Sequence, residues 1–167
     1  MAVTEAPASE ASVSARGTEL HATIEIAADP EDIWPFVTDV AAYARRSPQV
    51  ARTIVVPEPV RLGSWMFNLN RSGVRVWPTS ARVVRYEPFV EFAFRMNENF
   101  TIWSYRLEPG EGGRTRVVHR RETPQGISAP VRALIPLVFG GSAAFTAELL
   151  EGMAQSLEAL KSEVEAR

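Results

Sequence analysis

Apolar and polar residues alternate along much of the chain, which is the pattern of half-buried β-strands. A first strand is predicted from Thr18 to Ala28, and from about Val50 to Thr123 further strands follow one another. Their turns are expected at Ser72–Gly73, at Asn97–Asn99 and in the PGEGG segment of residues 109–113. Pro78 indicates an edge position or a bulge, because proline has no N–H to donate to a neighbouring strand. The pattern therefore predicts an antiparallel meander.

Helical spacing replaces this alternation in two parts of the chain. Asp29 is suited to cap a helix that begins with Pro30, and Pro35 keeps this helix short or kinked because it removes a backbone hydrogen bond. Residues 41–50 are expected to add a second short helical turn. The C-terminal stretch predicts one long amphipathic helix after a short helical or irregular lead-in at 131–141. Its apolar positions are Phe145, Leu149, Met153, Leu157, Leu160 and Val164.

The order of these elements predicts an α+β fold in which a curved antiparallel sheet wraps around the long C-terminal helix, with two short helices after the first strand. Such a sheet leaves space beneath it, and clefts of this kind commonly bind apolar ligands through a few polar groups. Residues 18–167 are expected to form a single domain. Residues 1–17 are rich in Ala, Ser and Glu and are expected to form a disordered tail.

The composition narrows the class of protein. A chain of 167 residues with 46% hydrophobic content and a net charge of −2 fits one soluble globular domain. The arginines are scattered, so neither a nucleic-acid partner nor a polybasic membrane anchor is expected. The longest apolar stretch, ALIPLVFGG, is too short for stable membrane insertion, and the N-terminus lacks the features of a secretory signal. A cytoplasmic location is therefore expected.

Several chemistries are disfavoured. The chain has no cysteine, and its two histidines, His21 and His119, lie far apart in the sequence, so no metal site is expected. No cofactor-binding motif or hydrolase motif is present, and no cofactor is expected.

In the strand Thr115–Thr123, successive side chains point to opposite faces. One face is mostly charged, as expected for a face in water, whereas the other carries Val117, His119 and Arg121. Extending this period of two to the other strands gives an inner face that is mostly apolar, with a polar cluster. The candidate ligand-binding residues on that face are Met66, Asn68, Asn70, Trp77, Thr79, Phe92, Phe94, Trp103, Tyr105, Val117, His119 and Arg121. The aromatic members also fit an ordinary core.

The sequence resembles the SRPBCC (START/Bet v 1-like) superfamily, and within it the polyketide cyclase/dehydrase-like group. The resemblance spans about Leu20 to the C-terminus and is carried by IEIAADPEDIWPFVTDV, LGSWMFNLNRSG, EPFVEFAFRM, WSYRLEPGEGGRTRV and LLEGMAQSLEALKSEV. It implies a helix-grip (Bet v 1-like) fold whose cavity lies between the sheet and the terminal helix. The family ranges from cyclases to carriers of lipids and other hydrophobic ligands. Phe145 and Leu149, early in that helix, are then also expected to line the cavity.

Three functions are compatible with this reading. The first is binding of a small hydrophobic ligand, of lipid, aromatic or polyketide-like character. The second is a cyclase/dehydrase-type enzyme in which His119, with Arg121 and Tyr105, moves a proton. A carboxylate or Tyr105 within hydrogen-bond reach of His119 would favour catalysis, whereas a backbone partner would favour a structural imidazole. The third is an interaction subunit, which requires an exposed apolar patch. A homodimer is left open, and Arg121 could instead pair with Glu98, Glu122 or a helix glutamate.

Overall fold

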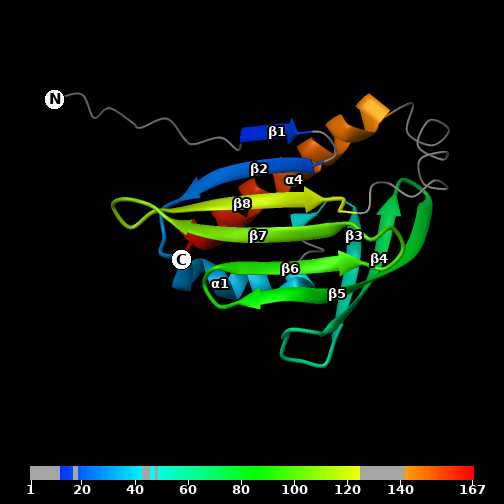
Figure 1. The fold of residues 1–167 in the computed structure, drawn as a ribbon, viewed down its shortest axis with the longest axis horizontal. Helices are drawn as coiled ribbons and strands as arrows, with labels where there is room; N and C mark the ends of the chain where they lie inside the picture. The colour runs from blue at the N-terminus through cyan, green and yellow to red at the C-terminus, as the bar shows by residue number, and fades with distance from the viewer. Residues whose placement is uncertain (1–11, 17–18, 43–45, 48, 125–141) are drawn as a thin grey trace.

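The computed structural model describes residues 12–16, 19–42, 46–47, 49–124 and 142–167. Within these residues, eight strands form one antiparallel sheet in the order β1-β2-β8-β7-β6-β5-β4-β3 (Figure 1). The strands are β1 (Ser12–Arg16), β2 (Glu19–Ile26), β3 (Val50–Val56), β4 (Trp65–Ser72), β5 (Arg75–Glu87), β6 (Glu91–Met96), β7 (Ile102–Pro109) and β8 (Thr115–Glu122). The strands from β3 onwards are sequential neighbours, as the predicted meander requires.

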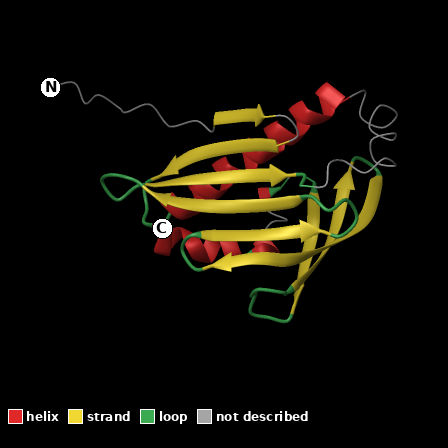
Figure 2. Ribbon diagram, viewed as in Figure 1, coloured by secondary structure: helices red, strands yellow, loops and turns green. Residues whose placement is uncertain are grey.

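The helices lie on one side of this sheet. Helix α1 (Pro30–Thr38) and the 3₁₀ turn η1 (Val40–Ala42) connect β2 to β3, and the long helix α4 (Ser142–Glu165) ends the chain. In Figure 2 the helices, coloured red, lie behind the curved sheet. The α+β helix-grip architecture predicted from the sequence is thereby confirmed. The predicted lead-in at 131–141 lies outside the described residues.

The turn chemistry of the meander follows the sequence. Gly73 has φ +59° in the β4–β5 turn, a left-handed conformation that glycine adopts at little cost. Pro78 pairs with Leu69 of β4, whereas pairing of β5 with β6 begins only at Ala81. Pro78 therefore occupies the predicted edge position, where its missing N–H breaks no ladder.

The predicted disordered tail is corrected at its end. Residues 12–16 form β1, which pairs with β2 from Ser12–Thr23 to Arg16–Glu19. A sheet edge presents unpaired backbone N–H and C=O groups, and a neighbouring segment can bind them through its backbone alone. Composition did not reveal this strand because such pairing does not require an apolar sequence. Residues 1–11 lie outside the described part of the chain.

Helix α1 is short, as the proline inside it requires. Asp29 occupies the predicted N-cap position, but its side chain makes no capping hydrogen bond; its backbone oxygen accepts from Asp32 and Ile33 instead. Trp34 is buried, and its ring packs edge-on against Tyr86 at 5.4 Å between centroids. The tryptophan thus anchors the helix to the sheet, which is the packing role expected for it.

The C-terminal half of α4 is fixed in the core. Met153, Leu157, Leu160 and Val164 are buried in one apolar cluster with residues of β2, β6 and β8. Polar contacts hold the same half at its edges. Glu163 accepts from the Arg46 guanidinium at 2.8 Å, Glu165 accepts from the Ala27 N–H at 2.9 Å, and Lys161 donates to the Glu25 carbonyl at 3.0 Å.

The two halves of the sheet have opposite polarity. In β6–β8 the inner face is largely apolar, while the outer face carries charge pairs such as Arg106 with Glu91 and Arg116 with Glu108. In β4 the inner face instead carries the buried Asn68 and Asn70. Its outer face exposes Trp65, Phe67 and Leu69. The inner face of β3–β5 is not polar throughout, because Val55, Met66, Ala81 and Val83 lie on it and belong to the core cluster.

Candidate functional site

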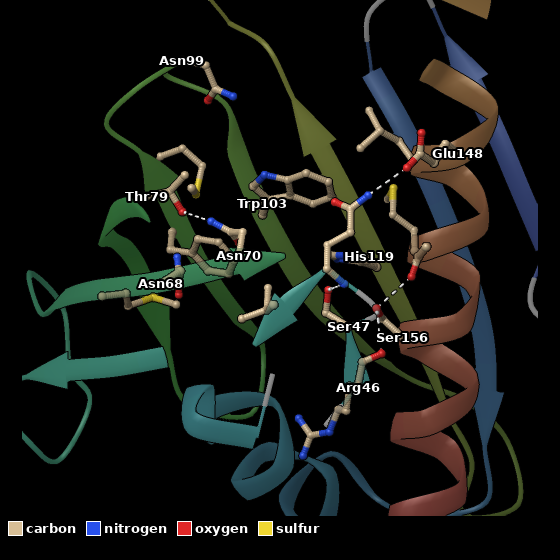
Figure 3. A pocket seen from close by; sticks show the side chains of 18 of the residues that line it. Arg46, Ser47, Asn68, Asn70, Thr79, Asn99, Trp103, His119, Glu148 and Ser156 are labelled. Atoms are coloured by element: carbon tan, nitrogen blue, oxygen red, sulfur yellow. Dashed lines mark hydrogen bonds between the residues drawn. The ribbon is translucent and has the colours of Figure 1, made fainter. Parts of the chain in front are cut away.

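A cavity of about 250 Å³ lies between α4 and the inner face of the sheet. Figure 3 shows Glu148 and Ser156 of α4 on one side, and Asn68, Asn70 and Thr79 of β4 and β5 on the other. Arg46, Ser47, Gln49, Asn99 and His119 add further polar groups, and the apolar part of the wall is mainly aromatic and sulfur-containing. The arrangement is that of a site for a hydrophobic ligand.

Most of the candidate residues meet in this cavity. Those that line it are Met66, Asn68, Asn70, Trp77, Thr79, Phe94, Trp103, Tyr105, His119 and Leu149. Four others do not. Phe92 and Val117 are fully buried in the core cluster, together with Leu157. The Arg121 guanidinium lies over the Trp103 ring. Phe145 is partly exposed on α4 and does not line the cavity. The alternation of residues along a strand predicts which side chains share a face. It does not predict which of them the helix covers and which of them border the cavity.

Part of the lining was not predicted. From α4 the cavity gains Glu148, Gly152, Met153 and Ser156, which extend the helical stripe that begins at Leu149, so the stripe could have identified them. Met96 continues the inner face of β6 and could have been included in the same way. The remaining residues, Arg46, Ser47, Gln49, Val50 and Asn99, lie in or beside connecting segments, where no periodic signal exists.

His119 is held in one orientation inside the cavity wall. Its Nδ1 lies 3.0 Å from the backbone oxygen of Ser104, and because that oxygen can only accept, Nδ1 carries the proton. Nε2 is then a hydrogen-bond acceptor. Burial lowers the pKa of His119 to about 4, partly offset by the bond to Ser104. The imidazole is therefore neutral near pH 7.

Two aromatic rings enclose this imidazole. Tyr105 stacks on it with 4.1 Å between centroids and 7° between planes, and Trp103 lies at 5.6 Å. Burial raises the pKa of Tyr105 to about 12, an effect that the positive charge of Arg46 opposes. The phenol therefore stays protonated at neutral pH. The cluster presents uncharged polar groups in an apolar wall.

The asparagines of β4 form the opposite polar wall. Asn68 Oδ1 accepts from the Thr53 hydroxyl at 2.9 Å, and Asn70 Nδ2 donates to the Thr79 hydroxyl at 2.9 Å and to the Trp77 carbonyl at 3.2 Å. Among the described residues, Asn68 Nδ2, Asn70 Oδ1 and His119 Nε2 have no hydrogen-bond partner. The lining thus retains one donor and two acceptors for a ligand.

Arg121 is buried beside the cavity rather than in its lining. Its guanidinium carbon lies 5.8 Å from the Trp103 ring centroid, a cation–π contact, and burial lowers its pKa. The ion pair considered with Glu98 or Glu122 does not form: Glu98 accepts from Ser80 and Glu122 pairs with Arg85. Arg121 therefore supports the position of Trp103.

The residues that the structure describes contain neither a metal-binding cluster nor a membrane-spanning helix. No group of three His, Cys, Asp or Glu side chains comes together there as a metal site, and His21 and His119 belong to alternate positions of paired strands, on opposite faces. No helix in the described ranges is both long and apolar enough to cross a membrane.

Known structures share this architecture at low sequence identity. The Zhui aromatase/cyclase from a Streptomyces species aligns with a TM-score of 0.67 and 18% identity over 89% of this chain and 94% of its own. A Thermus thermophilus protein, TTHA0849, gives 0.69 and 16% over 89% and 97%. The di-domain ARO/CYC protein StfQ of the steffimycin biosynthetic pathway gives 0.66 and 15%, and this chain spans 51% of its length. At these identities the likeness establishes the fold.

Sequence comparison gives the family. No curated protein sequence matches significantly. The sequence profile described as polyketide cyclase / dehydrase and lipid transport matches residues 17–165, which is nearly the whole chain and includes every strand from β2 to β8 and α4. The chain therefore belongs to the polyketide cyclase/dehydrase and lipid transport family.

Proposed function

We propose that the cavity binds a compact hydrophobic ligand that carries hydroxyl and carbonyl groups, of aromatic or polyketide-like character. The observation that supports this most directly is the set of unpartnered polar atoms in an otherwise apolar lining. Asn68 Nδ2 suits a ligand carbonyl, whereas Asn70 Oδ1 and His119 Nε2 suit ligand hydroxyl groups. None of the three atoms is among the fully buried atoms without a partner, so each is open to the cavity, where a ligand group can take the place of water.

The size and charge of the cavity narrow the ligand further. Its volume of about 250 Å³ is slightly below the roughly 300–1,000 Å³ usual for drug-sized ligands, which favours a small ring system. The Arg46 guanidinium is already engaged by Glu163 and the Phe36 carbonyl. A neutral ligand is therefore favoured over a strongly anionic one.

The first experiment is native mass spectrometry of the purified protein, followed by denaturation and identification of any released molecule. Calorimetric titration with 1,8-dihydroxynaphthalene and with naphthalene then tests the polar atoms. His119→Ala should weaken binding of the hydroxylated probe by about tenfold, the value of one hydrogen bond, and leave naphthalene binding unchanged. His21→Ala, on the opposite face of the sheet, is the matched control. An equal loss for both probes, or no binding of either by the wild type, would contradict the proposal.

A catalytic role for His119 is the second candidate, because Nε2 is an acceptor in the cavity wall. Two observations favour binding over catalysis. The imidazole is satisfied by the Ser104 backbone, and a pKa of about 4 makes it a weak base near neutral pH. If the protein is a cyclase/dehydrase, His119→Ala should abolish turnover of a poly-β-ketone while the far-UV circular dichroism stays native. Unchanged turnover would exclude His119 as the proton-transfer group.

A further inference from the structure

The outer side of β3–β5 is an exposed apolar surface, which we call the hairpin face. Its central residues are between 41% and 57% exposed: Ile54, Val56, Trp65, Phe67, Leu69 and Val76. They are neighbours, because Ile54 pairs with Phe67 and Val56 pairs with Trp65 across β3 and β4. The Trp65 and Phe67 rings also stack, with 12° between their planes. A patch this large and continuous on an ordinary surface indicates a binding role.

The charges around this face are mostly positive. Residues 50–87 contain six arginines and two acidic residues, Glu58 and Glu87, and the Glu98 carboxylate also lies close by, where it accepts from Ser80 opposite Phe67. Arg52, Arg71 and Arg82 share the outer face with the apolar residues, and the Arg82 guanidinium carbon lies 5.6 Å from the Trp65 ring centroid. In the described part of the chain, none of these three forms an ion pair. The face therefore complements an anionic, apolar partner.

The sequence suggested scattered arginines. The fold brings three of them to one face. Arg71 and Arg82 are eleven positions apart in the chain, but they lie on the same outer face of the paired strands β4 and β5, and Arg52 pairs with Leu69 on that face. Strand register brings these arginines together, and because they do not form a run in the sequence, the sequence alone does not reveal the cluster.

The two ends of the hairpin face show which partner fits. Leu62, in the β3–β4 loop, is 63% exposed, and Val74, in the β4–β5 turn, is fully exposed. Each apolar tip is directly adjacent in sequence to an arginine, Arg61 and Arg75 respectively. A lipid interface accommodates this arrangement without a shape-matched pocket, since apolar side chains enter the acyl boundary while arginines stay with the phosphates.

A second copy of the chain fits less well. A symmetric dimer through this face would bring the arginines of both copies together, and like charges placed face to face oppose association. We propose that the hairpin face docks on the surface of an anionic lipid membrane. Docking is peripheral: β4 lies along the surface, with Trp65 and Phe67 at the headgroup level.

The docked orientation connects the membrane to the cavity. Trp77 alternates with Val76 on β5, lines the cavity from the inner side and is itself 37% exposed. The same hairpin therefore presents one face to lipid and the other to the cavity. The docking surface does not depend on the identity or existence of the cavity ligand, so the two proposals are tested separately.

The test is sedimentation of the full chain with vesicles of phosphatidylcholine alone and of phosphatidylcholine with phosphatidylglycerol. Binding is expected only to the anionic vesicles and should weaken with salt. Arg71→Glu should lower the partition coefficient by at least about fivefold, because each arginine near an anionic surface contributes about that factor. Arg114→Glu is the matched control: it makes the same charge change on an exposed arginine in the β7–β8 turn, and should have little effect.

The apolar contribution is tested with the double variant Trp65→Ala/Phe67→Ala, with circular dichroism and urea unfolding as checks on the fold. Loss of vesicle binding in a folded variant supports the proposal. Absence of binding to anionic vesicles by the wild type overturns it. So does a concentration-dependent dimer in analytical ultracentrifugation that the double variant abolishes, since the face would then be an interface between copies. Equal losses for Arg71→Glu and Arg114→Glu would also overturn it, because binding would then follow net charge alone.

Discussion

The β3–β5 and β6–β8 regions of the sheet differ in which face carries polar and which face carries apolar side chains. On the inner face of β6–β8, Phe92, Leu107 and Val117 are buried in the core, and charges on the outer face pair with one another. In β3–β5, the inner face carries hydrogen-bonded asparagines and the outer face carries exposed aromatic rings. The strands of both regions alternate equally well, so alternation alone does not reveal which face meets water.

The difference follows from what covers each inner face. The C-terminal half of α4 belongs to the same core cluster as residues of β2, β6 and β8, so side chains there exchange water for apolar neighbours. The inner face of β4 and β5 is divided: Met66, Ala81 and Val83 belong to that cluster, whereas Asn68, Asn70 and Thr79 border the cavity, where polar groups remain accessible to a ligand. The apolar residues on the outer side of these strands remain exposed and form the hairpin face.

The largest expected effect separates the two regions by stability. Phe92 is fully buried, so Phe92→Ala should lower the free energy of unfolding by about 3–5 kcal/mol. Phe67 is 48% exposed on the outer face, and Phe67→Ala should change it by about 0.5 kcal/mol or less. Urea unfolding measures both. Similar losses for the two variants would mean that the hairpin face is part of the core in solution.

His119 belongs to β8 but lines the cavity together with the asparagines of β4, and its titration gives the next largest effect. The unfolded chain takes up the proton near pH 6.5, whereas the folded chain resists it down to about pH 4. Below pH 6.5 the unfolded state therefore binds more protons, and stability falls as the pH falls. The loss should reach about 3 kcal/mol by pH 4.

The pH effect is checked by measuring unfolding free energies between pH 7 and pH 4 for the wild type and His119→Gln. The carboxylates titrate in both proteins, so the difference between the two profiles isolates the imidazole. The wild type should lose stability more steeply. Parallel profiles would show that the imidazole is protonated in the folded protein as readily as in the unfolded chain.

The smallest effect concerns the outer charges. In β6–β8, Arg106 pairs with Glu91 and Glu108, so Arg106→Ala should lower the free energy of unfolding by about 1 kcal/mol or less, and high salt should reduce this loss. Arg82 pairs with no carboxylate in the described residues, and Arg82→Ala should leave stability unchanged. Thermal unfolding at low and high salt compares them. A salt-sensitive loss for Arg82→Ala would show that both regions carry paired charges.

Much of the fold could be predicted from the sequence because its signals are local. Gly73 indicated a turn, and Pro78 indicated an edge position. The apolar stripe from Met153 to Val164 indicated a helix that packs on the sheet. The missed strand β1 shows the limit of this approach. Its pairing depends on the free edge of β2, which is a property of the assembled sheet.

The sequence predicted which face of each strand contributes to the candidate site, but not which residues of that face line the cavity. Period-two phasing correctly placed Asn68, Trp103 and His119 on one surface, since that phase is intrinsic to each strand. Phe92 lies on the same surface, and only the position of α4 removes it from the lining. The contribution of Gln49 depends on the path of a connecting segment, for which a sequence pattern carries no information.

The two halves of α4 are held unequally. Glu163 and Glu165 tie the C-terminal turns to the rest of the fold, whereas no residue from 143 to 152 is fully buried, Leu149 and Leu150 pack only partly against the core, and the Gln49–Glu148 hydrogen bond crosses to the helix near the surface. The N-terminal half of the helix should therefore open locally at a lower free energy than the C-terminal half. Backbone amides of residues 147–152 should accordingly exchange their hydrogens well before those of residues 157–164.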